Sequence, residues 1–315
     1  MIFQISNLRF AYVAGKNGRP RHLNATSPAR HSQRGTVFDG LSLDIPRGAK
    51  IAVLGRSGVG KSTLLYLLGL LGHHSPGQGE ICYYRSPGRS PLVYGRKDFN
   101  PADVRSRYFG FALQSSYLMP TLTCIQNIFL PLALLGYHLE TCRMIAVHLL
   151  SHLDGSDTLT KRVDAYPSQV SEGQRQRMAL LRAIVHNPQV LFADEPFSSI
   201  DERATNDATA LLLRWHAGDL YDETISRMIA AHPSKISENG EGETESSAHP
   251  QKNRTCLLIT HDVEQAFEFA DAFLVFRPNG RPVKERILQK AELPIDPESA
   301  LQQLRHWIRE EIESD

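Results

Sequence analysis

Residues 55–62 read Gly-Arg-Ser-Gly-Val-Gly-Lys-Ser, which matches the phosphate-loop pattern G-x-x-x-x-G-K-S/T at every fixed position. An apolar run at 51–54 enters this loop as a strand, and residues 62–68 leave it as a helix. Glycines let several backbone N–H groups converge on phosphate oxygens, and the positive end of the helix dipole points at the same charge. Lys61 then reaches the β- and γ-phosphates while the Ser62 hydroxyl binds Mg²⁺. The stretch therefore predicts binding of a nucleoside triphosphate rather than a plain glycine-rich turn.

We expect the nucleotide to contact the whole loop and the start of the helix behind it. The expected contacts are Gly55, Arg56, Ser57, Gly58, Val59, Gly60, Lys61, Ser62 and Thr63.

The bulk composition is that of an ordinary globular protein. Of 315 residues, 41% are hydrophobic and 22% are charged, as in a typical soluble domain. The net charge of +1 gives no sign of a nucleic-acid binder, so no nucleic-acid partner is expected. The four cysteines lack C-x-x-C spacing, which argues against a disulfide framework and a zinc site and favours a reducing compartment. No stretch approaches the roughly 18–20 apolar residues that span a bilayer, so any membrane part is expected in another chain.

Segments of strand and helix character alternate along the chain. Strands are expected at 2–5, 9–12, 37–38, 41–45, 79–84, 190–193 and 255–260. From about 120 to 182, apolar residues recur at helical spacing. Uniformly apolar strands that alternate with helices indicate a parallel sheet covered on both faces, and hence an α/β fold.

Two polar stretches interrupt this pattern. Residues 15–36 carry five lysines and arginines and are expected to form a mobile basic loop. Residues 234–254 are rich in polar residues and bury too little apolar surface to order themselves, so a disordered insertion is expected there. The end of the chain, 297–315, places Leu301, Leu304 and Trp307 on one helical face and is expected to pack on the core.

A second motif, which is acidic, follows the apolar strand at 190–193. Asp194 comes directly after four apolar residues, a pattern that places a carboxylate beside the Mg²⁺ of a phosphate loop. Glu195 is then positioned to polarise a water molecule in line with the γ-phosphate. Taken alone, the motif also fits a buried strand that ends in two solvated acids. The phosphate loop upstream favours the catalytic interpretation.

Residues 170–177 read Val-Ser-Glu-Gly-Gln-Arg-Gln-Arg and lead into a helix. They resemble the L-S-G-G-Q signature of ATP-binding-cassette (ABC) ATPases. In that family a serine hydroxyl and a glycine N–H at a helix N-terminus bind the γ-phosphate held by the opposite subunit. The resemblance implies this role for Ser171, Gly173 and Gln174. Glu172 replaces the first glycine, so its carboxylate either weakens phosphate binding or points away into solvent.

Four more residues match the family's motifs in order. The resemblance implies that Gln114 senses Mg²⁺ and its water at the join to a helical subdomain, and that His261 holds the γ-phosphate. It also implies that Asp201 lies in the loop that touches the partner subunit, and that Tyr12 stacks on adenine. Singly, each match also fits an ordinary surface or structural residue, whereas six elements in one order favour the family.

The resemblance thus implies ATP as the ligand and Mg²⁺ as its cofactor. The catalytic residues it implies are Glu195, His261 and Gln114, and the Mg²⁺ ligands are Ser62, Gln114 and Asp194.

The resemblance covers residues 1–290 and implies one ABC ATPase domain. Its parts are a P-loop NTPase core of the RecA-like kind, an antiparallel β subdomain and a helical subdomain from about 115 to 182. Polar insertions are expected at about 15–36 and 216–254, because the sixty residues from Asp201 to His261 are about twice the family's usual gap. A helical tail is expected at 291–315.

The segments 117–123, 127–132 and 166–169 are similar to the lipoprotein-release, macrolide-export and cell-division branch of the family. The resemblance implies a homodimer or heterodimer of ATPase subunits that closes over two ATPs and drives an integral membrane permease. It would lie peripherally on the cytoplasmic face of the cell membrane. Two alternatives stay open: a soluble ABC ATPase that acts on nucleic acid or the ribosome, and a low-turnover regulatory module that binds ATP.

Overall fold

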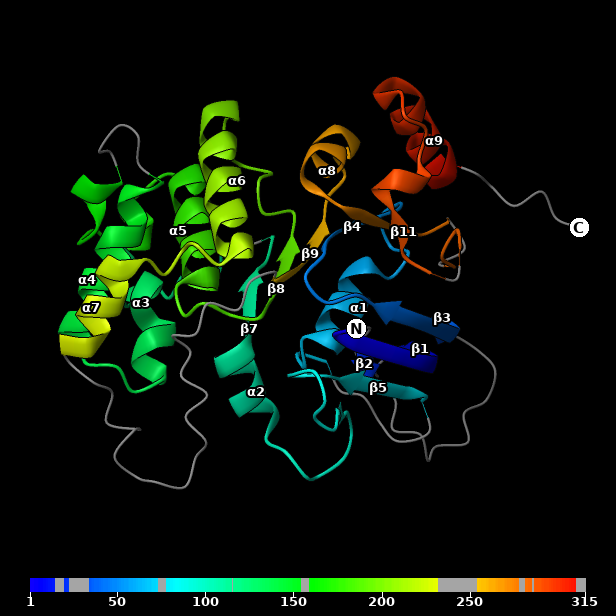
Figure 1. Ribbon diagram of the computed structural model, residues 1–315, viewed down its shortest axis with the longest axis horizontal. Helices are drawn as coiled ribbons and strands as arrows, with labels where there is room; N and C mark the ends of the chain where they lie inside the picture. Colours follow the sequence, from blue (N-terminus) through cyan, green and yellow to red (C-terminus); the bar gives the residue numbers. More distant parts are fainter. Residues whose placement is uncertain are drawn as a thin grey trace, which may run out of the picture. The chain divides into compact units, whose positions relative to one another are not determined.

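A computed structural model describes residues 1–14, 20–22, 34–72, 78–114, 116–153, 159–231, 254–277, 281–284 and 286–309. The chain divides into two units. Unit 1 comprises Met1–Pro101 and Leu257–Asp315, and unit 2 comprises Ala102–Cys256. Strand β9 (Thr255–Ile259) carries the chain from unit 2 back into unit 1 (Figure 1).

Unit 1 contains an antiparallel sheet built around its first strand. The strands are β1 (Phe3–Ala14), β2 (Pro20–His22), β3 (Arg34–Ile45), β5 (Glu80–Tyr83) and β6 (Leu92–Val93). Their order is β2-β1-β5-β6, and β3 also pairs with β1. Phe3 pairs with Ile45 of β3 and with Tyr83 of β5, so the start of β1 has a neighbouring strand along each of its edges.

Strand β1 is continuous where the sequence pattern predicts two strands, and β3 likewise joins two predicted strands. The reason is a bulge at Asn7, which has φ 50°, with register shifts against β3 from Ile5 onward. Phe3 and Ile5 are buried before the bulge, and Leu8 and Phe10 are buried after it. The extra residue therefore keeps the apolar side chains on one face although their alternation changes parity.

The second sheet region of unit 1 carries the phosphate loop. Strand β4 (Lys50–Leu54) is parallel to β10 (Ala272–Val275), and β11 (Leu288–Gln289) pairs antiparallel with β10. Helices α1 (Lys61–Leu68) and α8 (Val263–Phe269) follow β4 and β9, and a short 3-10 turn lies at Lys290–Glu292.

The chain's last helix, α9 (Pro297–Arg309), belongs to the core of unit 1, as the amphipathic pattern predicts. Ala300 and Leu304 are fully buried in a cluster with Leu54 and Phe273, and Leu301, Trp307 and Ile308 pack against that cluster. The apolar stripe of α9 thus covers side chains of the strand that leads into the phosphate loop.

Unit 2 pairs two parallel strands, β7 (Phe109–Ala112) and β8 (Val190–Asp194). Its helices are α2 (Pro101–Tyr108), α3 (Cys124–Leu134), α4 (Leu139–Ser151), α5 (Glu172–Ile184), α6 (Glu202–Ala217) and α7 (Glu223–Ala231), with 3-10 turns at Thr160–Arg162 and Pro167–Gln169. Helix α3 packs against α4 and α5. The predicted α/β fold with a helical part between 115 and 182 is thus present.

The two predicted polar insertions are partly ordered. Pro20–His22 pairs with β1 and Arg34–Thr36 belongs to β3, so the prediction of a loop is wrong for these residues. In the 216–254 stretch, α6 ends at Ala217 and α7 packs against α4, with Ile225 fully buried. The remainder, 15–19, 23–33 and 232–253, lies outside the described residues.

Among the described residues, no helix has both the length and the apolar character needed to cross a bilayer.

We expect Leu304→Ala to lower the free energy of unfolding by about 2–5 kcal/mol, because it removes a fully buried side chain and leaves a cavity. Chemical denaturation of the purified chain measures this loss. Gln302→Ala, an exposed change on the same helix, is the control. Equal stability of the two variants would show that α9 is not part of the core.

Burial lowers the pKa of His186 to about 4, although its Nε2–H donates to the Phe109 carbonyl at 3.0 Å. The folded protein therefore binds this proton less readily than the unfolded chain, whose histidine titrates near 6.5. Stability should fall as the pH drops from about 6.5 to 4, by roughly 2 kcal/mol on reaching pH 5. Denaturation at pH 7 and pH 5 should show this loss in the wild type and a smaller one in His186→Gln. Identical losses would contradict the assignment.

Candidate nucleotide-binding site

The phosphate loop between β4 and α1 contains a turn that only glycine accommodates. Gly58 and Gly60 have φ of 84° and 104°, in the left-handed region. A Cβ on Gly60 would lie 2.5 Å from Val37 Cγ1 of β3, far inside van der Waals contact. Any larger residue would therefore push the loop away from the antiparallel sheet.

Lys61 is held against the loop that precedes it. Its side chain is buried, and the ammonium group donates to the Gly55 carbonyl at 2.7 Å and the Arg56 carbonyl at 2.9 Å. Ser62 follows on the same first turn of α1. Glycine backbone, a helix N-terminus, an ammonium group and a hydroxyl together make the donor set that a triphosphate with Mg²⁺ needs, so these residues fit ATP.

Tyr12 lies beside the helix of the phosphate loop. Its hydroxyl forms a 3.1 Å hydrogen bond with Thr63 Oγ1, and its ring meets Phe10 edge to face at a centroid distance of 5.2 Å. The structure thus brings the residue predicted to stack on adenine next to α1.

His261 follows β9 in unit 1 and is exposed. It lines a cavity of about 240 Å³ together with Gly55, Glu264, Arg305 and Arg309. The guanidinium of Arg56 donates to the Arg309 carbonyl at 3.0 Å. The C-terminal helix therefore reaches the phosphate loop and His261, a proximity that its amphipathic pattern alone does not predict.

The acidic motif of unit 2 lies where β8 ends. Asp194 is its last residue and is buried, whereas Glu195 is half-buried with φ 50°. A positive φ at a non-glycine residue is uncommon and marks a sharp change of chain direction directly after the strand.

Gln176 connects this turn to the signature helix. From α5 its Nε2 donates to the Glu195 carbonyl at 2.9 Å and to Ser198 Oγ at 3.3 Å, and its Oε1 accepts from the Ser199 N–H at 2.8 Å. The side chain is only 4% exposed. A buried amide with three partners fixes the backbone at Glu195 and the loop after it.

Ser171 begins α5 as its N-cap. Ser171 Oγ accepts from the Gln174 N–H at 3.2 Å, and the Gln174 side chain accepts from the Ser171 N–H at 3.0 Å. This capping box satisfies two of the helix's terminal donors. A Cβ on Gly173 would lie 2.9 Å from the Ser199 carbonyl oxygen, so α5 and the loop at 198–201 approach closely only because this residue is glycine.

The Glu172 carboxylate does not simply point away into solvent, which was one of the two courses left open by the sequence. Its carboxylate accepts from Arg175 Nε at 3.0 Å and from Ser116 Oγ at 3.1 Å, while half of the side chain stays exposed. The hydrogen bond from Arg175 lowers the pKa of Glu172. The extra negative charge in the signature is therefore ionised and paired with Arg175.

Gln114 follows β7 and is exposed. The segment after it is fixed from two helices. Arg182 of α5 donates to the carbonyls of Ser116 and Tyr117, each at 2.9 Å. Asn127 of α3 is fully buried, and its amide binds backbone groups of Met119, Leu122 and Thr123. The segment is thus held to the signature helix and to α3.

Residues 38–198 match the family model described as ABC transporter. The chain belongs to the ABC transporter family. It is 34% identical over 217 residues to the lipoprotein-releasing system ATP-binding protein LolD of Xanthomonas campestris. The aligned region covers 68% of this chain and 86% of that protein. It is also 37% identical to LolD of Myxococcus xanthus, over 58% of this chain and 77% of that one.

The ABC fold is also found among solved structures. The post-hydrolysis dimer of the ATP-binding cassette MJ0796 with ADP and Pi matches with a TM-score of 0.66 and 21% identity, over 92% of this chain and 99% of that one. The fold is that of an ABC ATPase, with a mixed sheet and an antiparallel β subdomain, as the resemblance implies. The chain is an ATP-binding and ATP-hydrolysing subunit of an ABC transporter.

Three residues that position the motifs of this ABC subunit were not predicted from the sequence. They are Gln176, Arg182 and Asn127. Arg182 stands out in the sequence as a charged residue between a leucine and an alanine, whereas Gln176 lies between two arginines and carries no such signal. Asp201, assigned by resemblance to the loop that touches a partner, caps α6 by accepting from the Ala204 N–H at 2.9 Å.

We expect Gln176→Ala to lower the kcat of ATP hydrolysis on the order of 10–100-fold, because Glu195 loses its backbone anchor. The affinity for ATP should stay within about twofold, since the phosphate loop belongs to unit 1. Steady-state kinetics and nucleotide titration separate the two effects, with Gln302→Ala as the exposed control. An unchanged kcat would contradict the positioning role.

Proposed function

We propose that this subunit works as a dimer, with a second copy or a related cassette, that closes over two ATP molecules. One subunit binds the triphosphate with its phosphate loop, and the partner caps it with Ser171 and Gly173. The observation that carries the proposal is the exposed, capped N-terminus of α5, where Ser171 lies on the surface of unit 2. A helix N-terminus of this kind suits an anion supplied from outside the unit.

Within each site we assign the roles by chemistry. Lys61 and the loop amides bind the β- and γ-phosphates, and Tyr12 contacts the base. Ser62, Gln114 and Asp194 supply oxygen atoms, the ligands that Mg²⁺ prefers. When bound, Mg²⁺ neutralises charge on the phosphates.

Glu195 accepts a proton from the attacking water, and His261 donates a hydrogen bond to the γ-phosphate. Loss of the γ-phosphate removes the anion that Ser171 and Gly173 bind across the interface, so the two subunits separate. Arg175 offsets the negative charge of Glu172 in the signature, which supports a hydrolysing enzyme over the low-turnover module.

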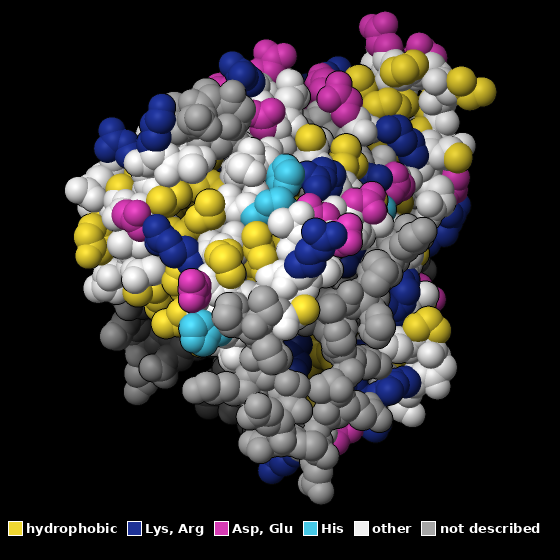
Figure 2. All heavy atoms as spheres, turned by 60° about the vertical axis from the view of Figure 1, so that its left-hand side comes forward, with side chains coloured by type: hydrophobic (Ala, Val, Ile, Leu, Met, Phe, Trp, Pro, Cys, Tyr) yellow, Lys and Arg dark blue, Asp and Glu magenta, His cyan; other side chains and the backbone are white. Residues whose placement is uncertain are grey.

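The closing and separation of the two subunits drives an integral membrane permease, so the subunit works peripherally at the cytoplasmic face of the membrane. In support, the segment fixed by Arg182 and Asn127 presents Tyr117 and Met119 with 68% and 49% of their surface exposed. Leu134, the last residue of α3, and Leu139, the first residue of α4, are 70% and 62% exposed. Figure 2 shows hydrophobic side chains between charged ones on the side brought forward. The similarity to LolD favours a role in lipoprotein release.

Glu195→Gln should bind ATP without hydrolysing it and accumulate as an ATP-dependent dimer, because the γ-phosphate that joins the two subunits persists. Light scattering after size exclusion measures the mass with ATP and with ADP. Lys61→Ala is the control and should stay monomeric under both conditions. A monomeric Glu195→Gln chain with ATP bound would contradict the proposal.

A further inference from the structure

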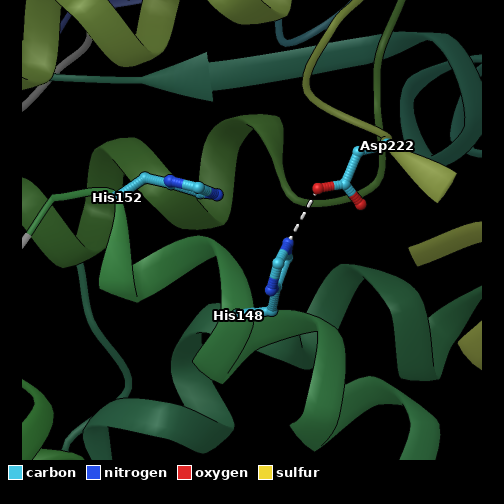
Figure 3. A group of neighbouring side chains, drawn as sticks. All are labelled: His148, His152 and Asp222. Atoms are coloured by element: carbon cyan, nitrogen blue, oxygen red, sulfur yellow. Dashed lines mark hydrogen bonds and ion pairs between the residues drawn. The ribbon is translucent and has the colours of Figure 1, made fainter. Parts of the chain in front are cut away.

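Two histidines and one aspartate converge in unit 2, away from the motifs described above. His148 lies in the last turn of α4 and His152 is its C-cap, with helical backbone angles. Their spacing of four residues therefore places both imidazoles on one face of the helix. Asp222 comes from the segment just before α7. Figure 3 shows the three side chains pointing toward a common space.

The ligand atoms of the three residues lie within 4.8 Å of one another. His148 Nε2 and Asp222 Oδ2 are 3.1 Å apart. In a tetrahedral zinc site with bonds of about 2.0–2.1 Å, neighbouring ligand atoms lie about 3.3 Å apart. His148 and Asp222 already have this separation. His152 is exposed and needs to approach by at most about 1.5 Å, a distance within reach of a rotation of its side chain.

The carboxylate of Asp222 is oriented by its own helix. Its Oδ1 accepts from the Ile225 N–H at 3.0 Å, as a cap of α7, and this leaves Oδ2 directed at His148. Outer contacts of this kind fix a ligand's direction in metal sites. His148 and Asp222 keep 24% and 35% of their side-chain surface exposed, so an ion has access.

We propose that His148, His152 and Asp222 bind Zn²⁺ and thereby fasten α7 to α4. Two imidazoles and one carboxylate are ligands that suit zinc, with water completing the coordination. The spacing of the cysteines argues against a zinc site, but this cluster uses none of them. The proposal is independent of ATP binding, because all three residues lie apart from the motifs of the nucleotide site.

The charges around the cluster act in both directions. Burial, then Arg214 and His148, lower the pKa of His152, while Asp222 acts in the opposite direction. Arg214 of α6 repels a cation, whereas the Asp222 carboxylate attracts it. A metal binds imidazole in its neutral form, so the three ligands of a bound ion would carry one negative charge, which offsets the charge of Arg214.

The test uses the metal-stripped full-length chain without nucleotide, in excess Mg²⁺ so that sites for hard cations are occupied. Zn²⁺ is titrated calorimetrically, and Co²⁺ is added separately as a spectroscopic probe. The variants are His152→Gln and Asp222→Asn. Asparagine preserves the cap of α7 but lacks the carboxylate. His138→Gln, at the exposed start of the same helix, is the matched control.

We expect one equivalent of Zn²⁺ to bind the wild type and His138→Gln, and each ligand variant to bind it at least about tenfold more weakly. Zn²⁺ should also raise the melting temperature of the wild type and of His138→Gln, and leave that of the two ligand variants unchanged. Co²⁺ should give the intense visible absorption of a tetrahedral site. Equal Zn²⁺ binding by the wild type and both ligand variants, or a weak octahedral Co²⁺ spectrum, would overturn the proposal.

Discussion

The left-handed turn at Gly60 is the constraint on which the nucleotide site depends. Val37 of β3 fills the space that a Cβ would need, so the loop can curl only with glycine there. Lys61, the next residue, then starts α1 with its ammonium group against the carbonyls of Gly55 and Arg56. The antiparallel sheet and the parallel strand β4 thus jointly determine where a triphosphate would be bound. The helix α9 packs on the same core and reaches Arg56.

In unit 2, the functional motifs are joined through one helix. The helix α5 begins at the signature, and its buried Gln176 fixes the chain at Glu195 and Ser199. Arg182, two turns later, holds the segment that follows Gln114. A movement of α5 would therefore displace the acidic motif and the exposed segment at Tyr117 together. This linkage offers a physical route from phosphate contact at Ser171 to a membrane partner, in keeping with the proposed function.

Motifs that depend on local chemistry could be predicted from the sequence, and the family they imply is confirmed. Three features were predictable because one physical cause explains each sequence pattern. They are the phosphate loop, the strand before Asp194 and the amphipathic α9. Features that depend on distant partners were missed. The bulge at Asn7 joins two predicted strands because β3 compensates for it. Helix α7 is ordered because Ile225 is buried in unit 2, and the polar residues around it in the sequence do not predict this burial. The partners of Gln176 lie about twenty residues away in the chain.

In the proposed dimer, each ATP is shared between the phosphate loop of one subunit and the signature of another. Mixing two inactive variants, Lys61→Ala and Ser171→Arg, tests this sharing most directly. Neither variant alone can form a site with both elements intact, whereas the mixed dimer has one site with an intact loop and an intact signature. If ATP is shared in this way, hydrolysis should return when the two purified variants are combined. A mixture as inactive as its separate components, while mixed dimers form, would contradict it.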